Sequence, residues 1–243
     1  MNQSIYKITS NQNLTQNVFK MTLKGDTSAL TRSGQFINLT VEGCYLRRPI
    51  SVYDYDENSI TIIYKVVGEG TQKMSQWQNG YECDILTGLG NGFDKDVSGE
   101  NPVLIGGGVG IPPMYHLCKA LIKDGKKPSV ILGFNTKDEI FCEKDFLDLG
   151  VQTTVTTVDG SYGVKGFVTD ALKNMTYSFF YTCGPLKMFE AIEKVATTEG
   201  EYSFEERMGC GFGACMGCSC KTKYGNKRIC KDGPVLKRSE VIW

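Results

Sequence analysis

Half of the ten cysteines of this 243-residue chain fall within residues 210–243. Four of them, Cys210, Cys215, Cys218 and Cys230, have the spacing C-x4-C-x2-C-x11-C. The tail that carries them holds too few apolar residues to fold without a cross-link. A secreted disulfide framework would spread its cysteines through a short chain behind a signal peptide, and the first residues here show no such leader pattern. We therefore expect a metal site in a protein of a reducing compartment.

The cysteine spacing favours iron over zinc. Three cysteines on one loop with a distant fourth is the plant-type pattern of 2Fe–2S clusters, whereas structural zinc prefers two CxxC-like knuckles. Zinc and free thiols remain the alternatives. Cys220 follows Cys218 by two residues and competes for the fourth position, but in an extended segment it would point away, so we assign it to packing. Glycines that remove crowding Cβ atoms from the loop fit a cluster: Gly209, Gly211, Gly213 and Gly217.

The charge balance argues against nucleic acid as a binding partner. The chain has 27 Lys and Arg against 27 Asp and Glu, so it carries no formal net charge. Proteins that bind nucleic acid usually carry a basic excess, because phosphates dominate that affinity. No run approaches the roughly 18 apolar residues of a membrane span. We expect a cytoplasmic protein that binds neither nucleic acid nor membrane.

Three segments predict a multi-domain β plus α/β fold. Residues 1–99 are β-rich, typical of an antiparallel barrel or sandwich, with a short helix at 72–78 that Thr71 caps. Residues 100–200 alternate strands and helices, which indicates a parallel nucleotide-binding sheet, and residues 201–243 form the small cysteine-rich domain. The expected strands include 36–41, 59–67, 103–105, 129–134, 152–158 and 178–182; the expected helices include 112–123, 185–197 and short ones near Lys144 and Thr169.

A phosphate site is predicted in the first segment. Arg48 stands beside the rigid Pro49 and can present a fixed fork to a phosphate, while Ser51 of the Arg48-Pro49-Ile50-Ser51 stretch offers a hydroxyl to a ring heteroatom. Gly70 permits a close backbone approach, and Thr71 begins a helix whose free amides attract a diphosphate. A solvated arginine pair and an ordinary capped turn are the structural alternatives.

A second phosphate site is predicted in the middle segment. The glycines of the run Gly106-Gly107-Gly108-Val109-Gly110 follow a strand and open a helix, which is the geometry that cradles a dinucleotide. The run is not the G-x-G-x-x-G fingerprint. A later strand ends in Cys183-Gly184-Pro185, at the carboxyl edge of the sheet where ligands bind. Cys183 is either a core cysteine or a thiol beside the reactive nicotinamide carbon.

Taken in order, these motifs resemble the ferredoxin reductase-like superfamily. The tail narrows the resemblance, because Glu205-Glu206-Arg207-Met208 before the cysteine loop and Cys230-Lys231-Asp232-Gly233-Pro234-Val235 after it are similar to the electron-transfer subunits of NAD-dependent (type B) dihydroorotate dehydrogenases. The resemblance covers essentially the whole chain. One local departure is Thr87-Gly88, where the family pattern has Gly-Pro.

The resemblance implies an FAD-binding barrel, an NAD-binding domain and a 2Fe–2S domain. It implies that the cluster ligands are Cys210, Cys215, Cys218 and Cys230. It implies a nucleotide site at Gly106, Gly107, Gly108, Gly110, Gly184 and Pro185, with Cys183 near the nicotinamide. The FAD contacts that it implies are Arg48, Pro49, Ile50, Ser51, Ile63, Tyr64, Lys65, Gly70 and Thr71.

It further implies a partner, an FMN-containing dihydroorotate dehydrogenase catalytic subunit, in a heterotetramer of two copies of each chain. Electrons would pass from that FMN through the cluster and FAD to NAD, in pyrimidine (UMP) biosynthesis. We expect NAD rather than NADP, because Phe134–Glu139 carries one lysine against two acids. A subunit of an NAD(P)H–ferredoxin or sulfide oxidoreductase is the alternative within this class, and a zinc module or redox sensor is the alternative outside it.

Overall fold

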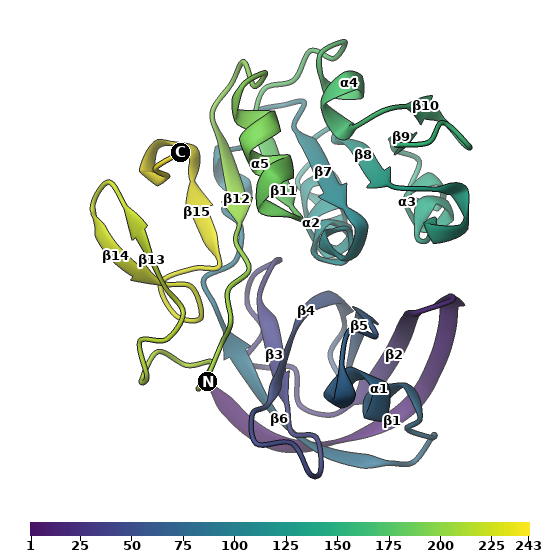
Figure 1. The fold of residues 1–243 in the computed structure, drawn as a ribbon, viewed down its shortest axis with the longest axis vertical. Helices are drawn as coiled ribbons and strands as arrows, with labels where there is room; N and C mark the ends of the chain where they lie inside the picture. Colours follow the sequence, from purple (N-terminus) through teal and green to yellow (C-terminus); the bar gives the residue numbers. More distant parts are fainter.

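The computed structural model describes residues 1–243 and begins with a closed six-stranded barrel (Figure 1). Its strand order is β1-β2-β5-β4-β3-β6, and every pairing is antiparallel. The barrel, not the sandwich, is therefore the correct alternative for the first segment. The strands are β1 Asn2–Thr15, β2 Val18–Lys24, β3 Phe36–Leu39, β4 Arg48–Tyr55, β5 Ser59–Lys65 and β6 Glu82–Leu89.

Alternation along the strands separates the inside of the barrel from its outside. Ile37 and Leu39 of β3 point into the barrel core, where they pack with Ile60, Ile62 and other buried apolar side chains. Phe36, on the same strand, joins a different core that includes residues of the C-terminal tail. Because successive side chains of a strand point to opposite faces, β3 has one face toward the barrel interior and one toward the rest of the molecule.

The short barrel helix begins earlier than expected. Helix α1 spans Glu69–Ser75 and has Gly68 at its N-cap position, so the prediction of a helix at 72–78 capped by Thr71 is wrong. Thr71 is the third helical residue, and its side chain forms hydrogen bonds to the backbone that precedes the helix. Its hydroxyl accepts from the amides of Val67 (2.9 Å) and Gly68 (3.2 Å) and donates to the Gly68 carbonyl (3.0 Å). A polar side chain at the third helical position can reach back to the N-cap amide, whereas an N-cap side chain accepts from amides inside the helix.

A seven-stranded sheet forms the middle of the molecule, in the order β10-β9-β8-β7-β11-β12-β15. All neighbouring strands are parallel except the last pair. The strands are β7 Val103–Gly107, β8 Ser129–Phe134, β9 Gln152–Thr157, β10 Val164–Lys165, β11 Phe180–Cys183, β12 Gly200–Ser203 and β15 Val235–Lys237. The parallel sheet predicted for this segment is confirmed.

Helices cover both faces of this sheet. Residues of α2 (Pro112–Lys123) and α3 (Glu143–Asp148) pack on the face that Leu104 presents. Residues of α4 (Val168–Leu172) and α5 (Leu186–Glu193) pack on the face that Val103 and Ile105 present. Helix α5 ends four residues before the predicted end at 197. Short 3-10 turns complete the connections, at Lys95–Val97, Gly108–Gly110, Lys137–Glu139 and Arg238–Glu240.

The C-terminal tail returns to the central sheet. Its hairpin, β13 Ser219–Thr222 and β14 Gly225–Arg228, lies outside the sheet, whereas β15 pairs antiparallel with β12. The division placed at residue 200 falls inside β12, and the division of the chain into three domains stays a prediction. Figure 1 shows the tail beside both the barrel and the sheet. The buried cysteines Cys218 and Cys230 share one core with residues of both parts.

Helix α2 joins the barrel to the sheet. Tyr53 and Tyr115 stack at 4.5 Å between ring centroids, and Tyr55 and His116 stack at 4.3 Å. Lys119 bonds Asp54 at 2.7 Å. Three consecutive residues of β4 therefore contact one face of α2, which fixes the orientation of the two parts. None of the helices has the combination of length and apolar character needed to cross a bilayer.

Candidate functional site

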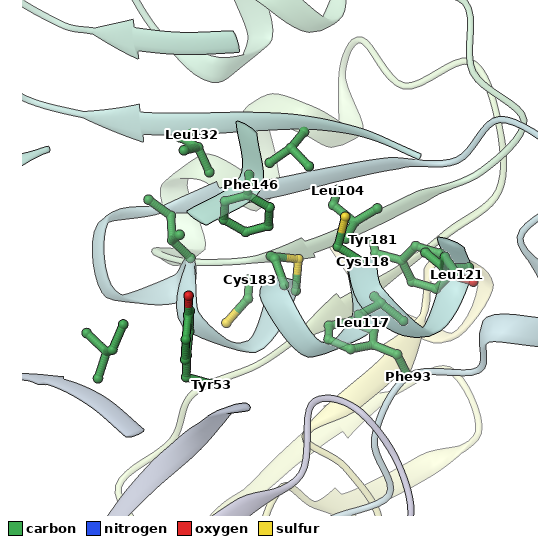
Figure 2. Close-up of a cluster of buried hydrophobic side chains, with 14 of the residues drawn as sticks. Tyr53, Phe93, Leu104, Leu117, Cys118, Leu121, Leu132, Phe146, Tyr181 and Cys183 are labelled. Atoms are coloured by element: carbon green, nitrogen blue, oxygen red, sulfur yellow. The ribbon is translucent and has the colours of Figure 1, made fainter. Parts of the chain in front are cut away.

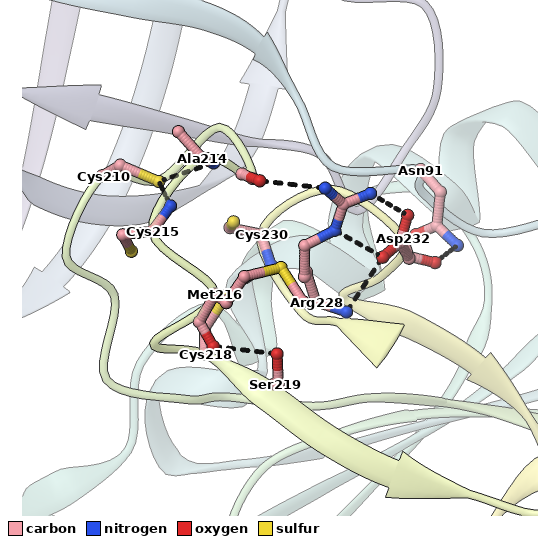
Figure 3. Close-up of polar contacts among 11 residues, drawn as sticks. Asn91, Cys210, Ala214, Cys215, Met216, Cys218, Ser219, Arg228, Cys230 and Asp232 are labelled. Carbon is pink, nitrogen blue, oxygen red and sulfur yellow. Dashed lines mark hydrogen bonds and ion pairs between the residues drawn. The ribbon is translucent and has the colours of Figure 1, made fainter. Parts of the chain in front are cut away.

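Four of the five cysteines of the tail lie in two pairs (Figure 3). The amide of Cys215 donates to Cys210 Sγ at 3.5 Å, and the amide of Cys230 donates to Cys218 Sγ at 3.4 Å. Two protein sulfurs for each of two irons is the ligand set of a 2Fe–2S cluster. A single zinc ion needs four converging ligands, and no three His, Cys, Asp or Glu side chains of the chain lie close enough together to hold one ion.

Backbone amides stabilise the thiolate of Cys210 in the first pair. Desolvation opposes ionisation of Cys210, but hydrogen bonds from the amides of Cys215, Phe212 and Ala214 outweigh it and lower the pKa of the thiol to about 6. The Ala214 amide lies 3.2 Å from Cys210 Sγ. Metal binding requires the thiolate, so this sulfur is close to its binding state at neutral pH. Burial and the neighbouring Cys218 sulfur raise the pKa of Cys230 to about 12, so this ligand would lose its proton on binding.

Two glycines of the cysteine loop lie next to the Cys215 sulfur. A Cβ atom on Gly209 would lie 3.2 Å from Cys215 Sγ, and one on Gly217 would lie 3.5 Å from the same sulfur. The Gly217 amide points at that sulfur, at 3.5 Å. The donor set, its pairing and the open backbone around it all fit an iron–sulfur cluster.

Cys220 lies in the hairpin, outside both pairs. It stands opposite Lys227 in the β13–β14 ladder and packs, half-buried, against the core that also contains Cys218 and Cys230. Burial raises the pKa of its thiol. Its position suits packing, as the sequence suggested, and its exclusion as a ligand stays a prediction.

The residues predicted to hold FAD come together on one side of the barrel. Arg48, Pro49, Ile50 and Ser51 open β4 and are half-buried. The Arg48 side chain lies over Gly70 of α1, since a Cβ atom on that glycine would be 2.1 Å from Arg48 Nε. The Arg48 side chain and the start of α1 therefore form one surface. The close approach of the guanidinium to α1 requires a glycine at position 70.

The predicted contacts on β5 face different ways. Ile63 packs in the core between barrel and sheet, whereas Tyr64 is 2% exposed and lies in the barrel core. The Tyr64 hydroxyl donates to Asn11 Oδ1 at 3.1 Å. Its side chain is thus occupied within the barrel, and only its backbone remains for a ligand. Lys65 ends the strand, half-buried.

The glycine run and the Cys-Gly-Pro turn meet at the carboxyl ends of β7 and β11. These strands are neighbours, with Cys183 opposite Gly106. A Cβ atom on Gly110 would lie 2.2 Å from the Cys183 carbonyl, and one on Gly184 would lie 3.2 Å from the Gly107 amide. Strand β8 lies on the other side of β7, so strand order reverses here, and open α/β sheets bind ligands at such a switch point.

Cys183 itself belongs to the core. Its side chain is 1% exposed and packs among the apolar residues shown in Figure 2. Burial, followed by the nearby Glu205 carboxylate, raises the pKa of the thiol, so it stays protonated at neutral pH. Its place beside a nicotinamide stays a prediction.

Two residues near the sites were given no role in the sequence analysis. Glu205 follows β12 and lies near Cys183; its carboxyl is enclosed enough that desolvation raises its pKa, although part of the residue faces solvent. Phe204 separates Glu205 from the end of β12, a strand that the sequence did not predict, so no local pattern marked this position. Asn38 of β3 reaches the cysteine loop, and no local pattern indicates that contact.

Two family models match the chain. Residues 205–242 match the iron–sulfur cluster binding domain of dihydroorotate dehydrogenase B, and residues 104–194 match the oxidoreductase NAD-binding domain. Among solved structures, the chain is similar to that of an NADH-dependent reduced ferredoxin-NADP oxidoreductase, with a TM-score of 0.88, 28% identity and coverage of 99% of this chain and 90% of that one. A ferredoxin NADP+ reductase from Neisseria gonorrhoeae shares the fold, with a TM-score of 0.71 and 16% identity over 84% of this chain and 100% of that one.

Curated relatives extend over nearly the full chain. A protein of Fusobacterium nucleatum subsp. nucleatum is 42% identical, with 96% of each chain covered. One of Bacillus pumilus is 41% identical over 99% of this chain and 98% of the relative. Both are named dihydroorotate dehydrogenase B (NAD(+)), electron transfer subunit. With the paired cysteines, the barrel and the glycine-lined switch point, this similarity shows that the chain belongs to the family of dihydroorotate dehydrogenase B electron transfer subunits.

Proposed function

We propose that this chain carries electrons between NAD and a dihydroorotate dehydrogenase catalytic subunit that contains FMN, in de novo pyrimidine (UMP) biosynthesis. The observation that carries the proposal is the position of the paired cysteines, whose loop lies against the same β3 strand that pairs with the predicted FAD stretch of β4. When bound, FAD exchanges electron pairs with a nicotinamide and an iron–sulfur cluster exchanges single electrons, so a chain that holds both adapts one mode to the other.

The residues of the tail would hold the cluster. Cys210 and Cys215 would bind one iron and Cys218 and Cys230 the other, in line with their pairing. Amides of Ala214, Cys215 and Gly217 would remain directed at the sulfurs and stabilise their negative charge. This assignment rests on the sequence spacing and on the hydrogen bonds to the sulfurs.

The barrel would bind FAD through a small set of groups. The Arg48 guanidinium, held over Gly70, would contact the diphosphate, and the Ser51 hydroxyl would bond the flavin ring. Pro49, Ile50, Ile63, Lys65, Thr71 and the Tyr64 backbone would complete the site. The barrel–sheet interface at α2 would hold the flavin side of the barrel against the nucleotide crevice.

The crevice at β7 and β11 would bind NAD. Gly106, Gly107, Gly108 and Gly110 would let the backbone approach the diphosphate, and the turn at Gly184 and Pro185 would line the nicotinamide side. Pro112 and Pro113 open α2 and have no N–H to donate, so the amides for a diphosphate would come from the glycine run before this helix. We propose NAD over NADP because the segment after β8 is acidic.

The partner is inferred from the same family. We infer a heterotetramer with two copies of each chain and a cytoplasmic location. All ten cysteines are free of disulfides, which suits a reducing compartment. The runner-up function is a subunit of an NAD(P)H–ferredoxin or sulfide oxidoreductase, which is favoured by the TM-score of 0.88 to the reduced ferredoxin-NADP oxidoreductase.

Co-expression tests the proposed function. The chain is produced with the FMN-bearing dihydroorotate dehydrogenase of its own genome, and the complex is purified without oxygen. We expect the two chains to co-purify in equal amounts and dihydroorotate to reduce added NAD only in the complex. Failure to associate, or NAD reduction that does not need this chain, would exclude the role. Co-purification with a second large flavoprotein that carries further clusters would instead support the runner-up.

A further inference from the structure

The barrel contacts the cysteine loop through one buried amide. Asn38, on β3, is 1% exposed and points away from the barrel interior, on the same face as Phe36. Its Nδ2 donates to the carbonyl of Cys210 at 3.4 Å, a long hydrogen bond that spans 172 positions of sequence. The acceptor belongs to a proposed cluster ligand, so this bond ties the barrel to the ligand's own backbone.

Gly211 brings the loop onto that amide. It has a φ of +79°, and a Cβ atom built on it would lie 2.4 Å from Asn38 Nδ2. Any other residue would force the loop and the amide apart. Asn38 therefore supplies the hydrogen-bond donor, and Gly211 leaves the space in which the loop can reach it.

The other side of Asn38 faces the predicted FAD stretch. Asn38 stands opposite Pro49 in the β3–β4 ladder. Proline has no N–H to donate, and the Asn38 carbonyl instead accepts from Arg47 Nη1 at 3.4 Å. Arg47 is itself held by Asp84 at 2.9 Å. One residue thus connects the strand that carries Arg48, Pro49 and Ser51 to the loop that carries Cys210.

An asparagine is a costly choice at this position. Its Oδ1 is buried and has no hydrogen-bond partner. A buried acceptor without a partner is unfavourable, because nothing compensates for its loss of hydration. Local violations of this kind are expected where a residue serves function.

We propose that Asn38 is a positioning residue that fixes the Cys210 arm of the cluster loop relative to the FAD-binding strands. It acts through the Cys210 carbonyl and so sets the geometry of electron transfer between the two cofactors. The proposal deepens the proposed function and rests on it. The wild-type chain, assayed for iron, acid-labile sulfide and FAD, checks that foundation separately.

Asn38→Leu is the first test, made in the full chain with its cofactors. Thr87→Val is its matched control, because Thr87 lies on the neighbouring strand β6, is 1% exposed and also has a hydroxyl without a partner. We expect Asn38→Leu to keep its FAD and its melting temperature but to shift the electron paramagnetic resonance spectrum and midpoint potential of the reduced cluster. After mixing with NADH, FAD reduction should keep its rate while cluster reduction slows several-fold. Thr87→Val should match wild type.

A double-mutant cycle keeps the proposal testable if Asn38→Leu folds poorly. Gly211→Ala and Gly213→Ala introduce the same strain, since both glycines have positive φ, at +79° and +92°. Only the first methyl group meets Asn38, because the second meets the flexible side chain of Lys231. We expect Gly211→Ala to shift the cluster spectrum more than Gly213→Ala does, and Asn38→Ala to relieve that shift in the double variant.

Wild-type spectra, potential and transfer rates in Asn38→Leu would overturn the proposal. Strictly additive shifts in the Asn38→Ala/Gly211→Ala cycle would overturn it as well. A wild-type chain that holds no cluster would instead overturn the proposed function on which the inference rests.

Discussion

Arg228 and Asp232 form a two-pronged ion pair across one turn of the tail. Arg228 Nε lies 2.9 Å from Asp232 Oδ2, and Arg228 Nη2 lies 3.1 Å from Oδ1. The remaining prong, Nη1, donates to the carbonyl of Gly213 in the cysteine loop at 2.9 Å (Figure 3). The carboxylate thus aims the guanidinium, and the guanidinium holds the loop between Cys210 and Cys215. This fork geometry is specific to arginine.

Arg228→Lys should loosen the cluster loop. Lysine keeps the charge but lacks the planar fork that bonds both Asp232 oxygens and the Gly213 carbonyl, so we expect faster bleaching of the cluster in air. Loss of visible absorbance over time measures the effect. Lys221→Ala, on the same hairpin, is the control, and equal bleaching in both variants would contradict the bracing role.

The effect of Arg228→Lys on cluster bleaching should not depend on pH between about 5 and 9. Hydrogen bonds from Arg228 lower the pKa of Asp232 to about 2. A lowered carboxyl pKa adds stability above the unfolded value of about 3.9 and loses it only as pH falls through the folded value. The bleaching ratio of variant to wild type should therefore be flat from pH 5 to pH 9; a ratio that changes steadily across that range would show another group at work.

Cys230→Ser should abolish the cluster, whereas Cys220→Ser should keep it. Cys230 is paired with Cys218 by its amide, while Cys220 packs in the hairpin. Serine preserves size and removes the thiolate. Iron and acid-labile sulfide per chain, measured in both variants, decide the point. The reverse result would make Cys220 the fourth ligand.

Arg48→Ala should weaken FAD retention and leave the cluster in place. A charge-assisted contact to phosphate contributes about 1.5–3 kcal/mol. Its loss corresponds to a roughly tenfold to hundredfold larger dissociation constant for FAD. Equilibrium dialysis, with FAD fluorescence as the readout, measures it. Lys24→Ala, at the end of β2 in the same barrel, provides the matched loss of charge. Unchanged affinity in Arg48→Ala would remove this residue from the site.

Glu201→Gln should stabilise the chain at alkaline pH. Glu201 is 3% exposed, and burial raises its pKa to about 7, although the amide of Asp94 donates to its carboxylate at 3.0 Å. The folded state therefore holds a proton that the unfolded state releases near pH 4.3. Stability falls as pH rises from about 4 to 7 and stays lower above that range.

Urea unfolding at pH 5 and pH 8.5 measures this effect. The advantage of the glutamine variant over wild type should be larger at pH 8.5 by up to about 3 kcal/mol. Glu82→Gln, at an exposed position of β6, should show no such difference. The same advantage at both pH values would show that Glu201 is ionised in the folded chain throughout.

The regular patterns of the sequence predicted the architecture well. Helix α2 was placed at its observed bounds, and β8 likewise, because a clear apolar period and a proline or glycine boundary specify both. Strand β12 escaped detection, since Gly200–Ser203 contains one large apolar residue and becomes a strand through pairing with β11 and β15. Such a strand depends on neighbours that are distant in sequence.

The site was predictable to the extent that it is local. The cysteine spacing and the glycine run lie within short segments, so their chemistry can be recognised without the fold. The contact between Asn38 and Cys210 cannot, because alternation along β3 shows which residues leave the barrel but not what they meet. Tyr64 is the converse case: family resemblance marked it for FAD, and its hydroxyl is bound to Asn11 inside the barrel.

Chemical analysis of the anaerobically purified full chain tests the central claim most directly. Iron, acid-labile sulfide, zinc and FAD are measured on one sample whose folding is confirmed by its cooperative thermal unfolding. The account predicts about two irons, two sulfides and one FAD per chain and no zinc. A folded chain with stoichiometric zinc, or with no acid-labile sulfide, would contradict it.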